Sequence, residues 1–258
     1  VQGMTVAPFA PEIRDGRLYG RGACDTKGPM AAALWAVKTW SQTTASDYNV
    51  VFAATIGEEE LSVGASALAA AGFHADFAVA LEPTDLRVVH AAKGVLRLWV
   101  EAQGRAAHAA TPEAGENAIY RALPFLRHCA DTLAPAFAAH RHAILGPASL
   151  NVGLVDGGAG LNVVPASCRV GLDLRTHPDF DNAAALSAIQ RAAPELKVTV
   201  HRNGPSFALR TDHLWIQRLV RHAMGVTHVP WFSDANIFNA HGIPAVAFGP
   251  GSIAQAHT

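Results

Sequence analysis

The chain has 258 residues, of which 50% are hydrophobic and 16% are charged, and its formal net charge is −1. This apolar content is enough for one large domain or two smaller ones, and it excludes a disordered chain, which would show fewer apolar residues and more net charge. The near-neutral charge excludes the basic excess of a nucleic-acid-binding protein, and no apolar run approaches the roughly 18 residues that span a membrane.

The cysteines and the two ends of the chain add two expectations. Cys24, Cys129 and Cys168 are too few and too scattered for a disulfide framework, so a cytoplasmic protein is expected. Residue 1 is Val and no secretory signal follows it, while the chain stops at Ala256-His257-Thr258, directly after a Gly-Pro-Gly loop. We therefore expect a fragment of a longer protein, truncated at both ends.

The first third of the chain alternates helices and strands. The elements expected there are a helix at 29–40 with Pro29 at its first position, a buried strand at 49–56, a helix at 62–71 and an apolar strand at 76–81. This alternation predicts an α/β domain with a mostly parallel central sheet. In such sheets, functional side chains gather at the carboxyl ends of the strands.

The middle of the chain has a different order of elements. Expected are a strand at 95–102, a helix at 115–133 that Pro124 kinks, strands at 149–155 and 168–175, a helix at 182–193 and a strand at 196–202. The order β-α-β-β-α-β is that of the ferredoxin-like α+β unit.

Asn203-Gly204-Pro205 then ends the last predicted strand of this unit. The apolar segments 211–224 and 243–249 that follow are expected to belong to the first domain. The predicted organisation is a discontinuous domain of residues 1–91 and 205–258 with an inserted domain at 92–204.

Carboxylates follow the predicted strands of the first domain. Glu58, Glu59 and Glu60 come after one strand and Glu82 ends the next, so they are expected along one rim of the sheet. Burying adjacent carboxylates is costly unless a cation neutralises them. The alternative is a solvated strand end whose acids suit the start of a helix.

Asp25 lies in the glycine-rich segment Gly20-Arg21-Gly22-Ala23-Cys24-Asp25-Thr26-Lys27-Gly28, which brings the backbone close to a cleft. It could equally cap the helix that starts at Pro29. Taken with the glutamates and His257, Asp25 completes an oxygen and nitrogen donor set that zinc accepts, and a shared carboxylate could bridge two metal ions.

Eight sequence phrases carry a more specific resemblance. They are PFAPEIRDGRLYGRGACDTKG at 8–28, the acidic run at 58–60, LEPT at 81–84, AAKG at 91–94, GRAAHAATPEAGENAI at 104–119, LNVVP at 161–165, LDLR at 172–175 and GIPAVAFGPG at 242–251. In this order, the chain resembles the co-catalytic zinc amidohydrolases, the family of aminoacylase, acetylornithine deacetylase, succinyl-diaminopimelate desuccinylase and glutamate carboxypeptidase. The resemblance implies a zinc-binding α/β domain with an inserted ferredoxin-like dimerisation lid.

The resemblance also implies roles for the carboxylates. Asp25 matches the bridging metal ligand, Glu58 the general acid/base and Glu59 the adjacent ligand, with Glu59 and Glu60 as the competing pair. Glu82 matches a ligand of the other metal and His257 the C-terminal ligand. The implied cofactor is two Zn²⁺ ions per subunit, with Co²⁺ or Mn²⁺ as alternatives.

In the lid, His108 matches the histidine that polarises the scissile carbonyl, often in the partner subunit's site. Asn162 and Arg175 match substrate-binding residues, and the backbone at Gly249 and Gly251 lies beside that site. From the residues alone, Arg175 could instead be an exposed charge on the same strand face as Arg169 and Asp173, and His108 a solvated loop residue.

The implied function is hydrolysis of the amide bond of an N-acyl amino acid by a homodimer that associates through 92–204. The GPGSIAQAH ending resembles the acetylornithine deacetylase branch. One alternative is a zinc carboxypeptidase or dipeptidase, and another is a non-catalytic binding homologue. No nucleic-acid or membrane partner is expected.

The family begins its metal site with His-x-Asp and a Val-Pro phrase, which belongs directly before Val1. Without that phrase, one metal keeps Asp25, Glu59 and His257, and the other keeps Asp25 and Glu82. The chain by itself is therefore predicted to be an impaired enzyme.

Overall fold

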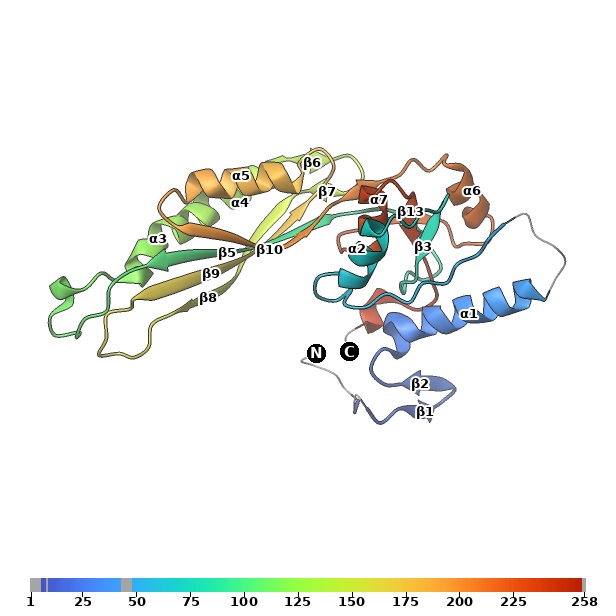
Figure 1. Ribbon diagram of the computed structural model, residues 1–258, viewed down its shortest axis with the longest axis horizontal. Coiled ribbons are helices and arrows are strands. Elements are labelled where there is room, and N and C mark those ends of the chain that lie inside the picture. The colour runs from blue at the N-terminus through green and yellow to red at the C-terminus, as the bar shows by residue number, and fades with distance from the viewer. Residues whose placement is uncertain (1–5, 8, 43–47, 257–258) are drawn as a thin grey trace. The chain divides into compact units, whose positions relative to one another are not determined.

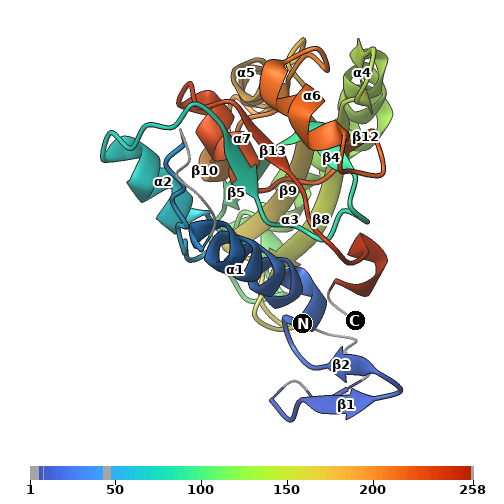
Figure 2. The same ribbon diagram turned by 90° about the vertical axis from the view of Figure 1, so that its right-hand side faces the viewer.

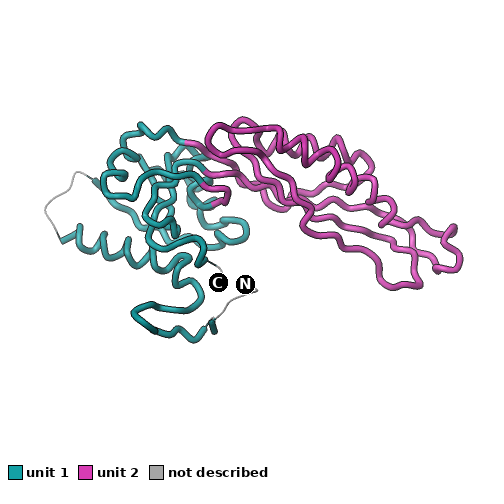
Figure 3. Tube along the Cα trace, turned by 180° about the vertical axis from the view of Figure 1, so that it is seen from behind, with its two compact units in different colours: residues 1–91, 209–228, 233–258 teal, residues 92–208, 229–232 magenta. Residues whose placement is uncertain are grey.

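The structure is a computed structural model that describes residues 6–7, 9–42 and 48–256. The chain divides into two compact units, which Figure 3 colours separately. Unit 1 consists of residues 1–91, 209–228 and 233–258, and unit 2 of residues 92–208 and 229–232. Across the described ranges, none of the helices combines the length and the hydropathy that crossing a membrane requires.

Unit 1 consists of short strands and helices (Figure 1). Its helices are α1 (Gly28–Ser41), α2 (Val63–Ala70), α6 (Leu214–Val220) and α7 (Asp234–Ala240), with the shorter turns η1 (Ala23–Lys27) and η4 (Ile253–Gln255). Its strands are β1 (Glu12–Arg14), β2 (Arg17–Tyr19), β3 (Ala78–Ala80), β4 (Val88–Ala92), β12 (Val226–Val229) and β13 (Ala245–Ala247). Helices α1 and α2 confirm the helices predicted at 29–40 and 62–71.

The sheet of unit 1 is mixed. Strand β13 pairs in parallel with β3, side by side in Figure 2, and antiparallel with β4, which also pairs with β12. Its core is formed by Val88, Ile216 and Val246, whose side chains are fully buried. This mixture of strands and helices confirms the predicted α/β class.

The strand predicted at 49–56 was wrong. This segment contains no residue in a strand, and Val50, Val51 and Ile56 are exposed. An apolar run favours an extended chain, but a strand also needs a neighbour that offers its backbone groups for pairing. Within the described residues, β3 pairs with β13 and does not pair with 49–56.

Unit 2 is a four-stranded antiparallel sheet with helices on one face (Figure 1). The sheet consists of β5 (Gly94–Gln103), β8 (Ser149–Gly157), β9 (Ser167–Thr176) and β10 (Lys197–Gly204), and the helices are α3 (Ala118–His128), α4 (Ala134–Ala139) and α5 (Asn182–Ala192). Shorter elements are η2 (Pro112–Ala114), η3 (Cys129–Leu133), β6 (Arg141–His142), β7 (Gly146–Pro147) and β11 (Phe207–Ala208).

The spatial order β10-β5-β9-β8 is the strand order of the ferredoxin-like unit. Burial alternates along β5, so that Leu96, Leu98 and Val100 pack against the helices while Arg97 and Trp99 lie on the open face. The open face is therefore the polar face of this unit.

The helix predicted at 115–133 consists of shorter pieces. Helix α3 begins after Asn117, whose side-chain oxygen accepts hydrogen bonds from the N–H groups of Ile119 and Tyr120, and it runs through Pro124. It ends at His128, where the π-helical turn η3 takes over and leads into α4.

Candidate metal centre

Asp25 lies in the turn η1, directly before α1. Gly22 has a φ of +74°, a conformation that favours glycine, and its carbonyl accepts a hydrogen bond from the Lys27 N–H at 2.9 Å. The peptide bond between Asp25 and Thr26 is cis. The N-cap position of α1 is occupied by Lys27, and it has no side-chain cap. The alternative role of Asp25 as the cap of this helix is therefore wrong.

The residues on either side of Asp25 connect its turn to two other segments of unit 1. The Thr26 hydroxyl donates a hydrogen bond to the carbonyl oxygen of Leu81, the neighbour of Glu82. The Cys24 thiol donates to the carbonyl oxygen of Ser252 at 3.4 Å. Asp25 is thus held between the end of β3 and the loop that follows β13.

Gly249 and Gly251 make this close approach possible. A Cβ atom at Gly249 would lie 2.7 Å from the carbonyl oxygen of Glu82 and 2.9 Å from the Cβ of Pro29, so a side chain does not fit there. Gly251 has a φ of +93°, and a Cβ atom there would lie 2.9 Å from the Sγ of Cys24. The structure therefore assigns both glycines a packing role beside the Asp25 turn.

Glu58 and Glu59 lie in the turn that precedes α2. The carbonyl of Gly57 accepts a hydrogen bond from the Ser62 N–H at 2.6 Å, which closes this turn. Helix α2 begins only at Val63 and has no acidic residue in its first turn. The glutamates therefore do not open a helix, which removes one of the alternatives left by the sequence.

Glu82 lies partly buried at the centre of a group of carboxylates. Burial, and after it the charges of Glu58, Asp25, Asp234 and Glu59 in that order, together raise the pKa of its carboxyl from 4.5 to about 9. Carboxylates crowded in this way are relieved either by a proton or by a bound cation. Carboxylates are also ligands for zinc and other divalent metals, so the chemistry of these residues fits a metal.

Asp234 is the member of this group that sequence reasoning missed. It is the first residue of α7 and is 8% exposed. Its Oδ2 accepts a hydrogen bond from the Thr55 hydroxyl at 2.8 Å, which anchors the segment that leads into Glu58. In the sequence, Ser233-Asp234-Ala235-Asn236 has the pattern of a helix start, and the Ser233 N–H does donate to the Asn236 side chain.

The full ligand set remains a prediction. Within residues 6–7, 9–42 and 48–256, no three His, Cys, Asp or Glu side chains converge closely enough to hold a metal ion. His257, the predicted C-terminal ligand, lies outside the described residues.

In unit 2, His108 and Asn162 lie in neighbouring loops. The Ala109 N–H donates to the Asn162 carbonyl at 3.0 Å, and both side chains are exposed. The Nδ1 atom of His108 accepts a hydrogen bond from the Ala110 N–H at 3.1 Å, which assigns the proton of the neutral ring to Nε2. His108 therefore presents an N–H donor, as a group that polarises a carbonyl oxygen must.

Arg175 lies at the opposite end of the same sheet. Ser167 pairs with Gln103 near the His108 loop, whereas Arg175 pairs with Val95 at the other end of β9. Eight residues of extended strand separate these ends by roughly 26 Å. One copy of unit 2 thus does not bring Arg175 together with His108 on one small substrate.

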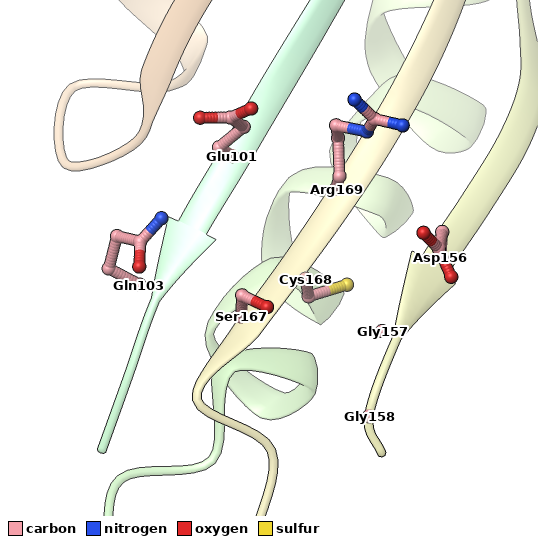
Figure 4. Close-up of a pocket in the computed structure, with 8 residues that line it drawn as sticks. All are labelled: Glu101, Gln103, Asp156, Gly157, Gly158, Ser167, Cys168 and Arg169. Atoms are coloured by element: carbon pink, nitrogen blue, oxygen red, sulfur yellow. The ribbon is translucent and has the colours of Figure 1, made fainter. Parts of the chain in front are cut away.

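A hollow on unit 2 contains none of the predicted site residues. Its volume is about 230 Å³, and Figure 4 shows the residues that line it, which are Glu101, Gln103, Asp156, Gly157, Gly158, Ser167, Cys168 and Arg169.

Comparison with known proteins identifies the family. The profile of peptidase family M20/M25/M40 matches residues 1–258. The chain belongs to this family. It is 33% identical over 261 residues to an acetylornithine deacetylase from Myxococcus xanthus, which covers 95% of the chain and 67% of that protein. It is 26% identical over 294 residues to a probable succinyl-diaminopimelate desuccinylase from Staphylococcus epidermidis, which covers 98% of the chain and 72% of that protein.

The solved structures agree with the fold. The M20 metallo-carboxypeptidase Sso-CP2 from Sulfolobus solfataricus is 16% identical and matches with a TM-score of 0.75 over 96% of this chain and 74% of that one. These findings confirm the predicted family and its hydrolase class. The chain spans between 61% and 72% of the length of the curated relatives it matches.

In this M20/M25/M40 member, Glu82→Gln is expected to stabilise the metal-free protein, increasingly so as the pH rises. Between pH 4.5 and about 9 the folded chain keeps a proton on Glu82 that the unfolded chain releases, so stability falls as the pH rises through this window. The slope is at most about 1.4 kcal/mol per pH unit. Because Gln does not ionise, the free energies of unfolding of the two proteins, measured by urea denaturation in EDTA, should diverge above about pH 5. Parallel pH profiles would contradict this.

Asp234→Ala is expected to weaken zinc binding although Asp234 was not predicted as a ligand. The change removes both a nearby negative charge and the anchor of Thr55, and loss of such supporting groups generally lowers metal affinity about 10- to 100-fold. Thr55→Val, which keeps the charge, should have a smaller effect. The matched control is Asp212→Ala, an exposed aspartate of the same unit that pairs with Arg210. Competition with a chelator measures the affinities, and equal affinities for all four proteins would refute the role of Asp234.

Proposed function

We propose that this hydrolase removes the acyl group from an N-acyl amino acid with the help of zinc ions held by the carboxylates of unit 1. The observation that carries the proposal is the burial of Glu82 among Asp25, Glu58, Glu59 and Asp234, an arrangement that a divalent cation stabilises. The similarity to proteins named acetylornithine deacetylase and succinyl-diaminopimelate desuccinylase supports a deacylase.

Different carboxylates would bind the metal and transfer the proton. Asp25, Glu59, Glu82 and His257 would hold the metal, which when bound supplies a Lewis acid and lowers the pKa of a coordinated water. Glu58 would accept the proton of the attacking water and pass it to the leaving amine. The turn that carries Glu58 is anchored through Thr55 to Asp234, which would keep the base in place.

The groups of unit 2 would bind and polarise the substrate. Arg175 would bind the carboxylate of the amino acid, because a guanidinium matches a carboxylate in shape and charge. The Nε2–H of His108 would stabilise the oxyanion. Asn162, whose carbonyl holds the His108 loop through Ala109, would take part in substrate binding.

The separation of His108 from Arg175 within unit 2 supports a homodimer, in which a second copy delivers His108. Edge strand β8 is the surface proposed for this contact. It carries no Lys or Arg, residues that block edge-to-edge pairing, and Leu154 and Val155 are 45% and 52% exposed. The other edge, β10, carries Lys197, His201 and Arg202.

Glu58→Gln is expected to lower the rate of N-acyl amino acid hydrolysis at least about a hundredfold, the usual contribution of a general base, while zinc binding persists. Glu59→Gln should lower zinc affinity, and Glu60→Gln should change neither property. Assays with N-acetyl amino acids and dipeptides, together with metal analysis of each variant, test this. If Glu59→Gln loses only activity and Glu60→Gln loses zinc, the competing pair is the correct one. Hydrolysis of dipeptides alone would replace the deacylase by a peptidase.

Val155→Lys is expected to convert a dimer into a monomer, because a charge on an exposed strand edge prevents pairing with a second edge. Val200→Lys on the opposite edge β10, where Val200 is 43% exposed, is the matched control and should leave the dimer intact. Sedimentation velocity measures both. A wild-type protein that is monomeric at micromolar concentrations would contradict the proposed dimer.

A further inference from the structure

One carboxylate on the open face of the lid sheet is shared by two arginines. The Nε of Arg97 lies 2.9 Å from the Oδ2 of Asp173, and the Nε of Arg175 lies 2.7 Å from its Oδ1. Arg97 and Asp173 are direct partners in the β5–β9 register, and Arg175 is two residues farther along β9. Asp173 therefore holds both guanidinium groups in a fixed relation to each other.

Two further cations adjoin this group. Lys93 is 9% exposed, and its Nζ donates to the Pro147 carbonyl at 2.5 Å. Burial lowers the pKa of Lys93, and the nearby charge of Arg175 lowers it further. Arg202 is 8% exposed, pairs in register with Arg97 and lies over the ring of Phe232 at 4.8 Å.

The arrangement differs from an ordinary surface network of ion pairs. In the next polar row of the same sheet, positive and negative charges alternate from strand to strand as Lys197, Glu101, Arg169 and Asp156, three of which Figure 4 shows. Here, in contrast, one carboxylate pairs with both Arg97 and Arg175, Lys93 lies near Arg175, and Arg202 is the register partner of Arg97. Cations held close together and partly out of water favour the binding of an anion.

We propose that the cluster of Lys93, Arg97 and Arg175 makes the lid selective for amide substrates that carry a second carboxylate. This rests on the proposed function, in which Arg175 binds the carboxylate of the amino acid. Because Asp173 holds Arg97 beside Arg175, a group bound at Arg175 has a second guanidinium next to it. The second carboxylate belongs to the acyl group or to the amino-acid side chain, and a cationic side chain such as that of ornithine is disfavoured.

The first test compares substrates that differ in one charge. N-acetylglutamate and N-succinylglutamine each carry a second carboxylate, on the side chain and on the acyl group respectively, whereas N-acetylglutamine does not. The zinc-loaded protein should hydrolyse at least one of the two dicarboxylates with a kcat/KM about tenfold or more above that of N-acetylglutamine, since a charge-assisted pair is worth roughly this factor. The dicarboxylate that is hydrolysed faster shows whether the second carboxylate belongs to the acyl group or to the amino-acid side chain.

Variants test the assignment to Arg97. Arg97→Gln should remove the preference by lowering kcat/KM for the dicarboxylate more than for N-acetylglutamine, and Arg97→Lys should restore part of it. Arg169→Gln is the matched control, because this arginine lies on the same sheet face over Trp99, 4.1 Å from the ring centre, and outside the cluster. Equal rates for N-acetylglutamine and both dicarboxylates, or a preference for N-acetylornithine, would overturn the inference while leaving the deacylase in place.

A binding measurement separates this inference from the proposed function. Glutarate should bind the protein about tenfold or more tightly than butyrate in calorimetry, and Arg97→Gln should abolish the difference. If no amide is hydrolysed but this difference is present, the deacylase fails and the dicarboxylate site stands. If glutarate and butyrate bind equally, the site is refuted whatever the activity.

Discussion

The structure of unit 1 depends on one electrostatic constraint, which is that several carboxylates are brought together with too little opposing charge. Glu82 is partly buried and lies near the charges of four other acids, which together raise the pKa of its carboxyl to about 9. Such an arrangement is unfavourable for folding alone. A bound cation would offset this cost, and the glycines and hydrogen bonds around Asp25 hold the acidic segments beside one another.

The acids come from segments that are far apart in the sequence. Thr26 contacts the end of β3, Cys24 contacts the loop after β13, and Thr55 contacts the start of α7. Each contact is a single hydrogen bond beside an acidic residue or to one. Small side chains and backbone atoms thus position the segments that carry the carboxylates. Unit 2 shows the opposite balance, because Asp173 pairs with two arginines, Arg97 and Arg175.

Many of the helices and strands, and several candidate site residues, were predictable from local sequence patterns. The helices α1, α2 and α5 and the strands of unit 2 follow from local sequence patterns and caps. Glu58, Glu59 and Glu82 were predicted as site residues because they follow predicted strands, although the strand before Glu58 does not form. The strand at 49–56 was predicted wrongly because pairing depends on a neighbour that the segment itself does not encode. Asp234 was missed because its tie to Thr55 spans 179 positions and its local pattern is that of a helix start. Arg97 was missed for a similar reason, since only the β5–β9 register places it beside Asp173.

The most direct test of the central claim is a zinc titration of the metal-free protein, followed by calorimetry and thermal unfolding. If the carboxylates of unit 1 form a cation site, zinc binds saturably and stabilises the fold by about 2.7 kcal/mol when its concentration is a hundred times its Kd. Replacing both Asp25 and Glu82 by Ala should abolish both effects. Zinc that neither binds nor stabilises the wild-type protein, or that binds the double variant equally well, would contradict the account.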